Sequence, residues 1–154
     1  ELDLSNSETF FELLEPRFLE NSDERCLGVR EMTGEISEKN PDGKIWRKPV
    51  LKEEYTWKSS KQVLEQIDNV AAGFKLVLGL EAKQKVVIYA DTCSEWLVTA
   101  LACFKNNYTI VTLYTNLGSD GVAFALKHVD AKVVVTSQEL LPKLILAKAS
   151  SSKF

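Results

Sequence analysis

Three short runs of β-branched and other apolar residues constrain the fold of this chain more than any other feature. Residues 86–90 and 132–136 show no alternation of apolar and polar side chains, and a third run lies at about 109–114. Such runs are typical of strands covered on both faces of a sheet. Stretches with helical spacing separate them, and parallel strands require such crossovers. The pattern predicts an α/β fold of three layers, with a mostly parallel sheet and right-handed crossover helices.

Local signals place the helices between these strands. Ser59 with Gln62 forms a capping-box pattern before apolar residues at helical spacing, and Gly79 stands where a left-handed C-terminal cap is needed. Thr92 and Glu95 repeat the capping-box spacing, which predicts a second helix closing at 106–107. The apolar face predicted for this helix comprises Trp96, Leu97, Ala100, Leu101 and Phe104. Residues 118–120 are predicted to open a third helix, and Ser137 is predicted to cap a final one.

The N-terminal part of the chain carries weaker signals. Residues 1–24 contain short apolar clusters around Pro16 without a sustained period, which indicates a loosely packed lead-in segment. Residues 25–30 and 44–47 flank a polar stretch containing the turn signal at 40–43, and they predict a small antiparallel strand pair with a long loop. We therefore divide the chain into a lead-in over 1–24 and an α/β domain over 25–154.

Composition limits the classes of function. The chain has 154 residues, a net charge of −3 and a pI of about 5.3, so nothing favours nucleic-acid binding. No run approaches the roughly 20 apolar residues that span a bilayer, and the acidic N-terminal residues do not resemble a signal peptide. The three cysteines form no C-x-x-C pair and suggest a reducing compartment. We expect a soluble chain.

The carboxyl ends of the predicted strands are the places where a ligand would bind. Loops and helix N-termini meet at that edge of a parallel sheet. Candidate segments there are 91–93, 114–118 and 136–137, and the second is the best because it combines Tyr114, Thr115 and Asn116 with a glycine before a helix. The alternative is that these residues only form the turn while Tyr114 packs.

Other chemically active side chains have simpler interpretations. Cys93 at a predicted helix N-terminus is either a reactive thiol or a structural residue, and Cys103 is expected in the core. His128, the one histidine in the sequence, suits the C-terminal end of a helix. Asp91 and Glu95 are ordinary structural acids at these positions, so we predict neither a catalytic residue nor a metal site. Two further groups are assigned to a solvated face (Lys143, Lys148 and Lys153) and to packing (Trp46, Trp57 and Trp96).

Several well-known catalytic motifs are missing from the sequence. It contains no G-x-x-x-x-G-K-[ST], no G-x-G-x-x-G after a strand, no G-x-S-x-G and no H-E-x-x-H. Spacing and composition alone therefore indicate an α/β chain without a visible active site.

Seven segments, in their order and spacing, are informative when they are read together. They are 26–31, 55–57, 79–81, 94–96, 102–104, 110–114 with 117–118, and 136–141. Together they resemble the opening region of long-chain acyl-CoA synthetases of the adenylate-forming superfamily, and the resemblance covers about residues 25–146.

The resemblance implies that the chain is an N-terminal fragment of a long-chain fatty acid–CoA ligase. Such an enzyme uses ATP and Mg²⁺ to form an acyl-adenylate and then transfers the acyl group to coenzyme A. Its phosphate loop, adenine-side motif and catalytic lid would lie downstream of Phe154. The fragment is expected to be inactive alone and to bind no cofactor tightly, and the turn at Tyr114, Thr115 and Asn116 is expected to border the coenzyme A side of the cleft.

The resemblance also carries expectations about location and partners. It implies the cytoplasmic face of the endoplasmic reticulum or of the outer mitochondrial membrane, with membrane association through a segment absent here. The alternative function is a non-enzymatic truncated product that acts as an interaction module through an exposed sheet edge. A flavodoxin-like regulatory module is a weaker option, because no cluster of acids follows the first strand.

Overall fold

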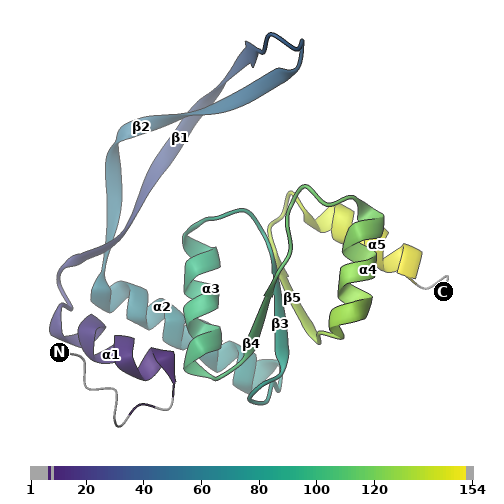
Figure 1. Ribbon diagram of the computed structural model, residues 1–154. Coiled ribbons are helices and arrows are strands. Elements are labelled where there is room, and N and C mark those ends of the chain that lie inside the picture. Colours follow the sequence, from purple (N-terminus) through teal and green to yellow (C-terminus); the bar gives the residue numbers. More distant parts are fainter. Residues whose placement is uncertain (1–6, 8, 152–154) are drawn as a thin grey trace.

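The computed structural model describes residue 7 and residues 9–151. Helices and strands alternate through most of this length (Figure 1). In chain order the elements are α1 (Phe10–Glu20), β1 (Arg25–Lys39), β2 (Ile45–Ser59), α2 (Ser60–Ala72), the π-helical turn η1 (Gly73–Val77), β3 (Lys85–Tyr89), α3 (Ser94–Lys105), β4 (Thr109–Thr112), α4 (Ser119–Val129), β5 (Val133–Thr136) and α5 (Leu141–Ser151).

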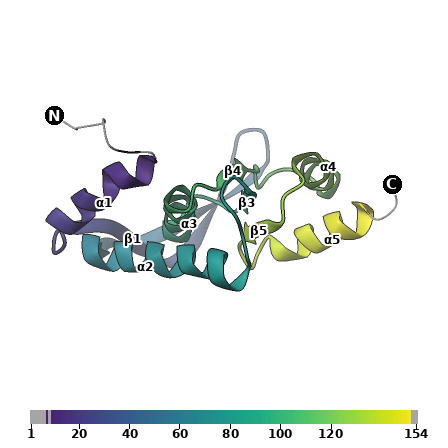
Figure 2. The ribbon, with the colours of Figure 1, turned by 90° about the horizontal axis from the view of Figure 1, so that it is seen from below.

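The main sheet has the strand order β4-β3-β5, and both strand pairs are parallel. Strand β3 lies at the centre, with Val87 paired to Val111 on one side and to Val134 on the other. Helices α2 and α3 cover one face, and α4 and α5 cover the other (Figures 1 and 2). The predicted α/β architecture of three layers with a parallel sheet is confirmed.

Burial on both faces explains the continuous apolar sequence of β3. Val86 packs among Phe74, Cys103 and Tyr108 beneath α2 and α3. Val87 and Tyr89 point to the opposite layer, which contains residues of α4 and α5. These three β3 side chains are fully buried. Since neither face meets water, apolar side chains are favoured at successive positions, and no alternation of apolar and polar residues is expected.

Helix α2 begins at its predicted cap, and the helical segment that it starts ends at the predicted glycine. The Ser59 hydroxyl accepts from the Gln62 amide at 3.3 Å, and the Gln62 side chain accepts from the Ser59 amide at 2.9 Å. This reciprocal pair is the predicted capping box. After α2 the backbone widens into η1, and Gly79 then adopts the left-handed conformation at φ +62°. A residue without a Cβ is favoured there.

The starts of two other helices differ from the sequence prediction. Helix α3 begins at Ser94 with Cys93 as its N-cap, and the cap makes no side-chain hydrogen bond, so the Thr92–Glu95 capping box is wrong. Glu95 instead accepts from the Ser94 hydroxyl at 2.8 Å. Helix α5 begins only at Leu141, so Ser137 is not its cap. The Ser137 carbonyl accepts from the amides of residues 140 and 141 in the turn before the helix.

The predicted apolar face of α3 is right in part. Ala100 and Leu101 are buried as predicted, and so is Cys103, whereas Leu97 and Phe104 are substantially exposed. Val98 and Ala102 are buried although they were not assigned to that face. The helix is apolar around most of its circumference, so spacing alone did not identify the buried side.

The prediction of a loosely packed lead-in is wrong for residues 10–20, which form α1. Thr9 caps this helix, and Glu12 completes the capping box. Phe11 is 2% exposed and shares a core with residues of α2 and α3. Packing of this aromatic side chain stabilises the helix despite the amide lost at Pro16. The domain division at residue 24 stays a prediction.

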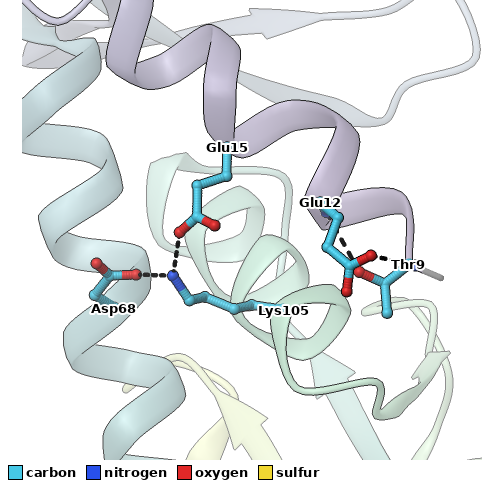
Figure 3. Close-up of polar contacts among 5 residues, drawn as sticks. All are labelled: Thr9, Glu12, Glu15, Asp68 and Lys105. Carbon is cyan, nitrogen blue, oxygen red and sulfur yellow. Dashed lines mark hydrogen bonds and ion pairs between the residues drawn. The ribbon is translucent and has the colours of Figure 1, made fainter. Parts of the chain in front are cut away.

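Lys105 at the end of α3 connects the three N-terminal helices (Figure 3). Its ammonium group lies 2.6 Å from the Glu15 carboxylate of α1 and 2.7 Å from the Asp68 carboxylate of α2. It also lies 5.0 Å from the centre of the Phe11 ring. Partial burial alone would lower the pKa of Lys105, but the hydrogen bonds that its ammonium group donates to Asp68 and Glu15 outweigh burial and raise the pKa.

Strands β1 and β2 form the predicted antiparallel pair, but the predicted long loop between them is wrong. Each strand has 15 residues, and only the tight turn at 40–44 joins them. Asn40 donates to the Lys44 carbonyl at 2.8 Å, and Gly43 has φ +85°. The ribbon rises away from the α/β layers (Figure 1). Its base is anchored by contacts with α2.

An aromatic and cationic row stabilises the base of this ribbon. The Trp57 and Tyr55 rings lie 5.4 Å apart, with Arg25 over Trp57 and Arg30 over Tyr55. A Cβ at Gly28 would lie 2.8 Å from the Trp57 ring. Glycine is therefore needed where this ring crosses β1. A two-stranded ribbon has little stability of its own in water, so these contacts matter.

We predict that Lys105→Met lowers the free energy of unfolding by about 1 kcal/mol near neutral pH, because two carboxylates lose their shared cation. A raised lysine pKa stabilises the fold below the unfolded value of about 10.4, and this contribution is lost as the pH rises through the folded value. The gap between wild type and variant should therefore shrink above about pH 10.4. Urea unfolding at several pH values measures this difference in the free energy of unfolding. Lys61→Met, a change at an exposed lysine, is the control. A gap independent of pH would contradict this role of the ammonium group.

Candidate functional site

The loops that follow β3, β4 and β5 meet at one edge of the sheet, as expected for parallel strands (Figure 1). The Thr115 hydroxyl donates to the Asp91 carboxylate at 2.6 Å. The Leu113 amide donates to the Ile88 carbonyl at 3.1 Å, which continues the pairing beyond β4. The structure thus joins two of the three segments that the sequence singled out, 91–93 and 114–118.

Lys143 also contacts the turn at 114–118. Its ammonium group donates to the carbonyls of Thr115 and Leu117, at 2.9 Å each. The assignment of Lys143 to a solvated face is therefore wrong, and Lys153 lies outside the described residues. One signal in the sequence pointed to this contact: Lys143 lies near the start of the helix after β5, which begins at the same edge as the turn.

The three residues predicted to border coenzyme A differ in their surroundings. Thr115 is occupied by Asp91 through its hydroxyl and by Lys143 through its carbonyl. Tyr114 is 80% exposed, so the alternative that it packs within this part of the fold is not what the structure shows. Asn116 is exposed as well. Tyr114 and Asn116 are therefore free to contact a ligand, whereas Thr115 shapes the turn.

Two buried hydroxyl groups at this end of the sheet were missed by sequence reasoning. Tyr89 and Thr136 are the last residues of β3 and β5 and are partners in the parallel register. Neither hydroxyl has a hydrogen-bond partner among the described residues. Buried polar groups normally find partners. The signal for them was a hydroxyl-bearing residue at the end of an otherwise apolar strand.

The acidic residues near the carboxyl ends of the strands accept hydrogen bonds from neighbouring groups in the fold. The pKa of Glu139 is lowered by a hydrogen bond from its own backbone amide and by the Ser137 hydroxyl, while the charge of Asp91 acts in the opposite direction. The pKa of Glu95 is lowered chiefly by the Ser94 hydroxyl. Residues 7 and 9–151 contain no group of three or more side chains suited to a metal ion.

The cysteines and the histidine do not assemble into a reactive group. Burial raises the pKa of Cys103 to about 12, so its thiol stays protonated and unreactive in the core, as predicted. Cys93 is exposed at the start of α3. His128 stacks on Phe124 with ring centres 6.0 Å apart, in the last turn of α4. That turn leads into β5 and lies at the opposite end of the sheet from the candidate edge.

The contact from the Thr115 hydroxyl to the Asp91 carboxylate holds the turn at 114–118 in place. We call this turn, which Lys143 also contacts, the braced turn. It presents two exposed side chains, Tyr114 and Asn116, at the carboxyl ends of the strands. Within the part of the chain that the structure covers, no helix is long and apolar enough to cross a membrane.

We predict that Lys143→Met loosens the turn and lowers the free energy of unfolding by about 1–2 kcal/mol, because two carbonyls lose a charged donor. Hydrogen exchange at the amides of residues 115 and 117 should accelerate, while exchange in β3 should change little. Lys132→Met, which removes an exposed lysine before β5, is the matched control. Equal exchange in the two variants would show that Lys143 does not hold the turn.

Comparison with a protein-family model gives a match over most of the chain. The family is described as "AMP-binding enzyme", and the match covers residues 38–153. It includes β2, the parallel sheet and the braced turn.

Curated relatives give a consistent result at the sequence level. Long chain acyl-CoA synthetase 8 of Arabidopsis thaliana is 31% identical over 129 residues, which is 84% of this chain and 18% of the relative. Long-chain-fatty-acid–CoA ligase 1 of Schizosaccharomyces pombe is 38% identical over 74 residues, which is 48% of this chain and 11% of the relative. The chain thus spans less than a fifth of the length of these relatives.

Solved structures agree on the fold. The A-PCP didomain of carboxylic acid reductase from Segniliparus rugosus, in complex with AMP, superposes with a TM-score of 0.74 at 16% identity. The similarity covers 94% of this chain and 20% of that one. At this identity the likeness concerns the fold alone. Since the family model matches well over half of the chain, the protein belongs to the AMP-binding enzyme family of adenylate-forming proteins.

Proposed function

We propose that this chain is the N-terminal part of a long-chain fatty acid–CoA ligase. The observation that carries the proposal is the similarity of this chain to long chain acyl-CoA synthetase 8 of Arabidopsis thaliana over 84% of its own length. The parent reaction would activate a long-chain fatty acid with ATP and transfer the acyl group to coenzyme A. The same resemblance favours a place at the endoplasmic reticulum or the outer mitochondrial membrane.

Within that reaction, we assign the braced turn to the coenzyme A side of the cleft. Tyr114 and Asn116 are exposed there, and Thr115 between them is held by Lys143 through its carbonyl and by Asp91 through its hydroxyl. An exposed aromatic ring and an amide suit stacking and hydrogen bonding to a nucleotide-bearing ligand. A prepositioned turn would contribute by lowering the entropic cost of binding.

The described residues do not fit ATP or Mg²⁺. No three ligating side chains converge, and the ammonium group of Lys143 is occupied by carbonyls. In the parent enzyme, ATP and Mg²⁺ would be held by residues outside those that the structure describes. The chain by itself should therefore neither form an acyl-adenylate nor retain the nucleotide.

A second candidate function is an interaction module without enzymatic activity. Strand β5 is an outer strand of the parallel sheet, and on its far side no other described strand pairs with it. Its sequence, residues 133–136, contains no charge and no proline, the usual features that block strand addition. A partner could extend the sheet there.

We predict that the chain incubated with ATP, Mg²⁺, palmitate and coenzyme A gives no palmitoyl-CoA, and that a longer protein containing it does. In that longer protein, a double change of Tyr114→Ala and Asn116→Ala should raise the KM for coenzyme A several-fold and leave ATP–pyrophosphate exchange unchanged. Leu76→Ser, which alters an exposed residue of η1, is the control. Turnover by the chain alone would refute its inactivity, and an unchanged KM would refute the placement of the turn.

A further inference from the structure

The far end of the β1–β2 ribbon exposes large apolar side chains. We call residues 36–48 the hairpin tip. Within it, Ile36 is 55% exposed, Ile45 68% and Trp46 58%, so the assignment of Trp46 to packing is wrong. The tip lies at the end of the ribbon farthest from the helices (Figure 1). Apolar side chains grouped in this way mark a surface for interaction.

The same tip is positively charged although the chain as a whole is acidic. Its four cations stand against two acids, Glu38 and Asp42, which gives a net charge of +2 in a chain with a net charge of −3. The cations are Lys39, Lys44, Arg47 and Lys48. This local excess favours a negatively charged partner.

The strand register places cations beside apolar groups on both faces of the tip. On one face Ile45 is paired with Lys39, and Arg47 follows two residues later on the same side. On the other face Trp46 is paired with Glu38, and Ile36 with Lys48. Both faces of the tip therefore combine apolar and cationic side chains. The tip could thus insert into a partner surface along the axis of the ribbon.

Ion pairs within the tip do not neutralise it. Lys44 lies 3.4 Å from Asp42, and Lys48 pairs with Glu38, but all four side chains are at least half exposed. Exposed pairs of this kind contribute little in water and exchange easily. Lys44 and Lys48 therefore remain available to an external anion.

We propose that the hairpin tip binds an anionic lipid surface. A tryptophan side chain favours the headgroup region, isoleucine the acyl boundary, and lysine and arginine the lipid phosphates. A second copy of this chain is a poorer partner, because two tips face to face would bring positive charge against positive charge. This contact is independent of the proposed ligase chemistry. It would be a membrane contact made by the described residues themselves.

Vesicle binding tests the proposal with the full chain. Vesicles of phosphatidylcholine with about 30% phosphatidylserine should sediment the protein, and vesicles of phosphatidylcholine alone should not. Salt at about 0.5 M should release it. The tryptophan emission of the protein should shift to shorter wavelength on binding, and Trp46→Phe should remove most of that shift.

Variants of the tip distinguish this contact from non-specific adsorption to vesicles. Lys39→Gln with Arg47→Gln should lower the partition constant about fivefold for each cation removed. Trp46→Ser should lower it several-fold, whereas Phe124→Ser, a change at an exposed aromatic residue of α4, should leave it unchanged. Thermal unfolding of each variant checks that the fold is kept.

Three results would overturn the proposal. The first is no sedimentation with anionic vesicles. The second is sedimentation that Trp46→Ser and Phe124→Ser reduce equally. The third is a dimer in solution that depends on the tip, in a protein that does not bind vesicles.

Discussion

The fold depends on one constraint, the burial of β3 on both faces. A strand that meets water on neither side must be covered by helices above and below. Val86 faces the layer of α2 and α3, and Val87 faces the layer of α4 and α5. Because β4 and β5 pair with opposite edges of β3 in parallel, the two crossover helices lie on opposite faces of the sheet.

The same constraint brings the candidate site together. Parallel strands end at a common edge, so residues distant in sequence become neighbours there. Thr115 reaches Asp91 from a position 24 residues away, and Lys143 reaches Thr115 from 28 residues away. These contacts fix the backbone of a turn and leave Tyr114 and Asn116 to the solvent. The arrangement is suited to border a ligand whose chemistry takes place elsewhere in a longer protein.

Sequence reasoning succeeded where a local interaction decides the structure. The Ser59–Gln62 capping box and the left-handed Gly79 were predicted because each depends on residues close in the chain. It failed where distant contacts outweigh local preference. Helix α1 persists across Pro16 because Phe11 is buried against two other helices, and the pattern of residues 1–24 does not reveal that partner.

The candidate site shows the same division. The turn at 114–118 was identified from its residue types, but the roles of its members depend on contacts that spacing does not give. Thr115 binds within the fold, and Lys143 turns toward the edge because α5 starts beside it. The length of the β1–β2 ribbon was also hidden, since its exposed strands alternate weakly and its bulges interrupt the register.

Hydrogen exchange resolved by residue tests the central claim most directly. If burial of β3 on both faces organises the fold, the amides of residues 86–89 should be the slowest to exchange, and those of the β1–β2 ribbon should exchange far sooner. Ribbon amides that exchange as slowly as those of β3, or β3 amides that open first, would contradict the account.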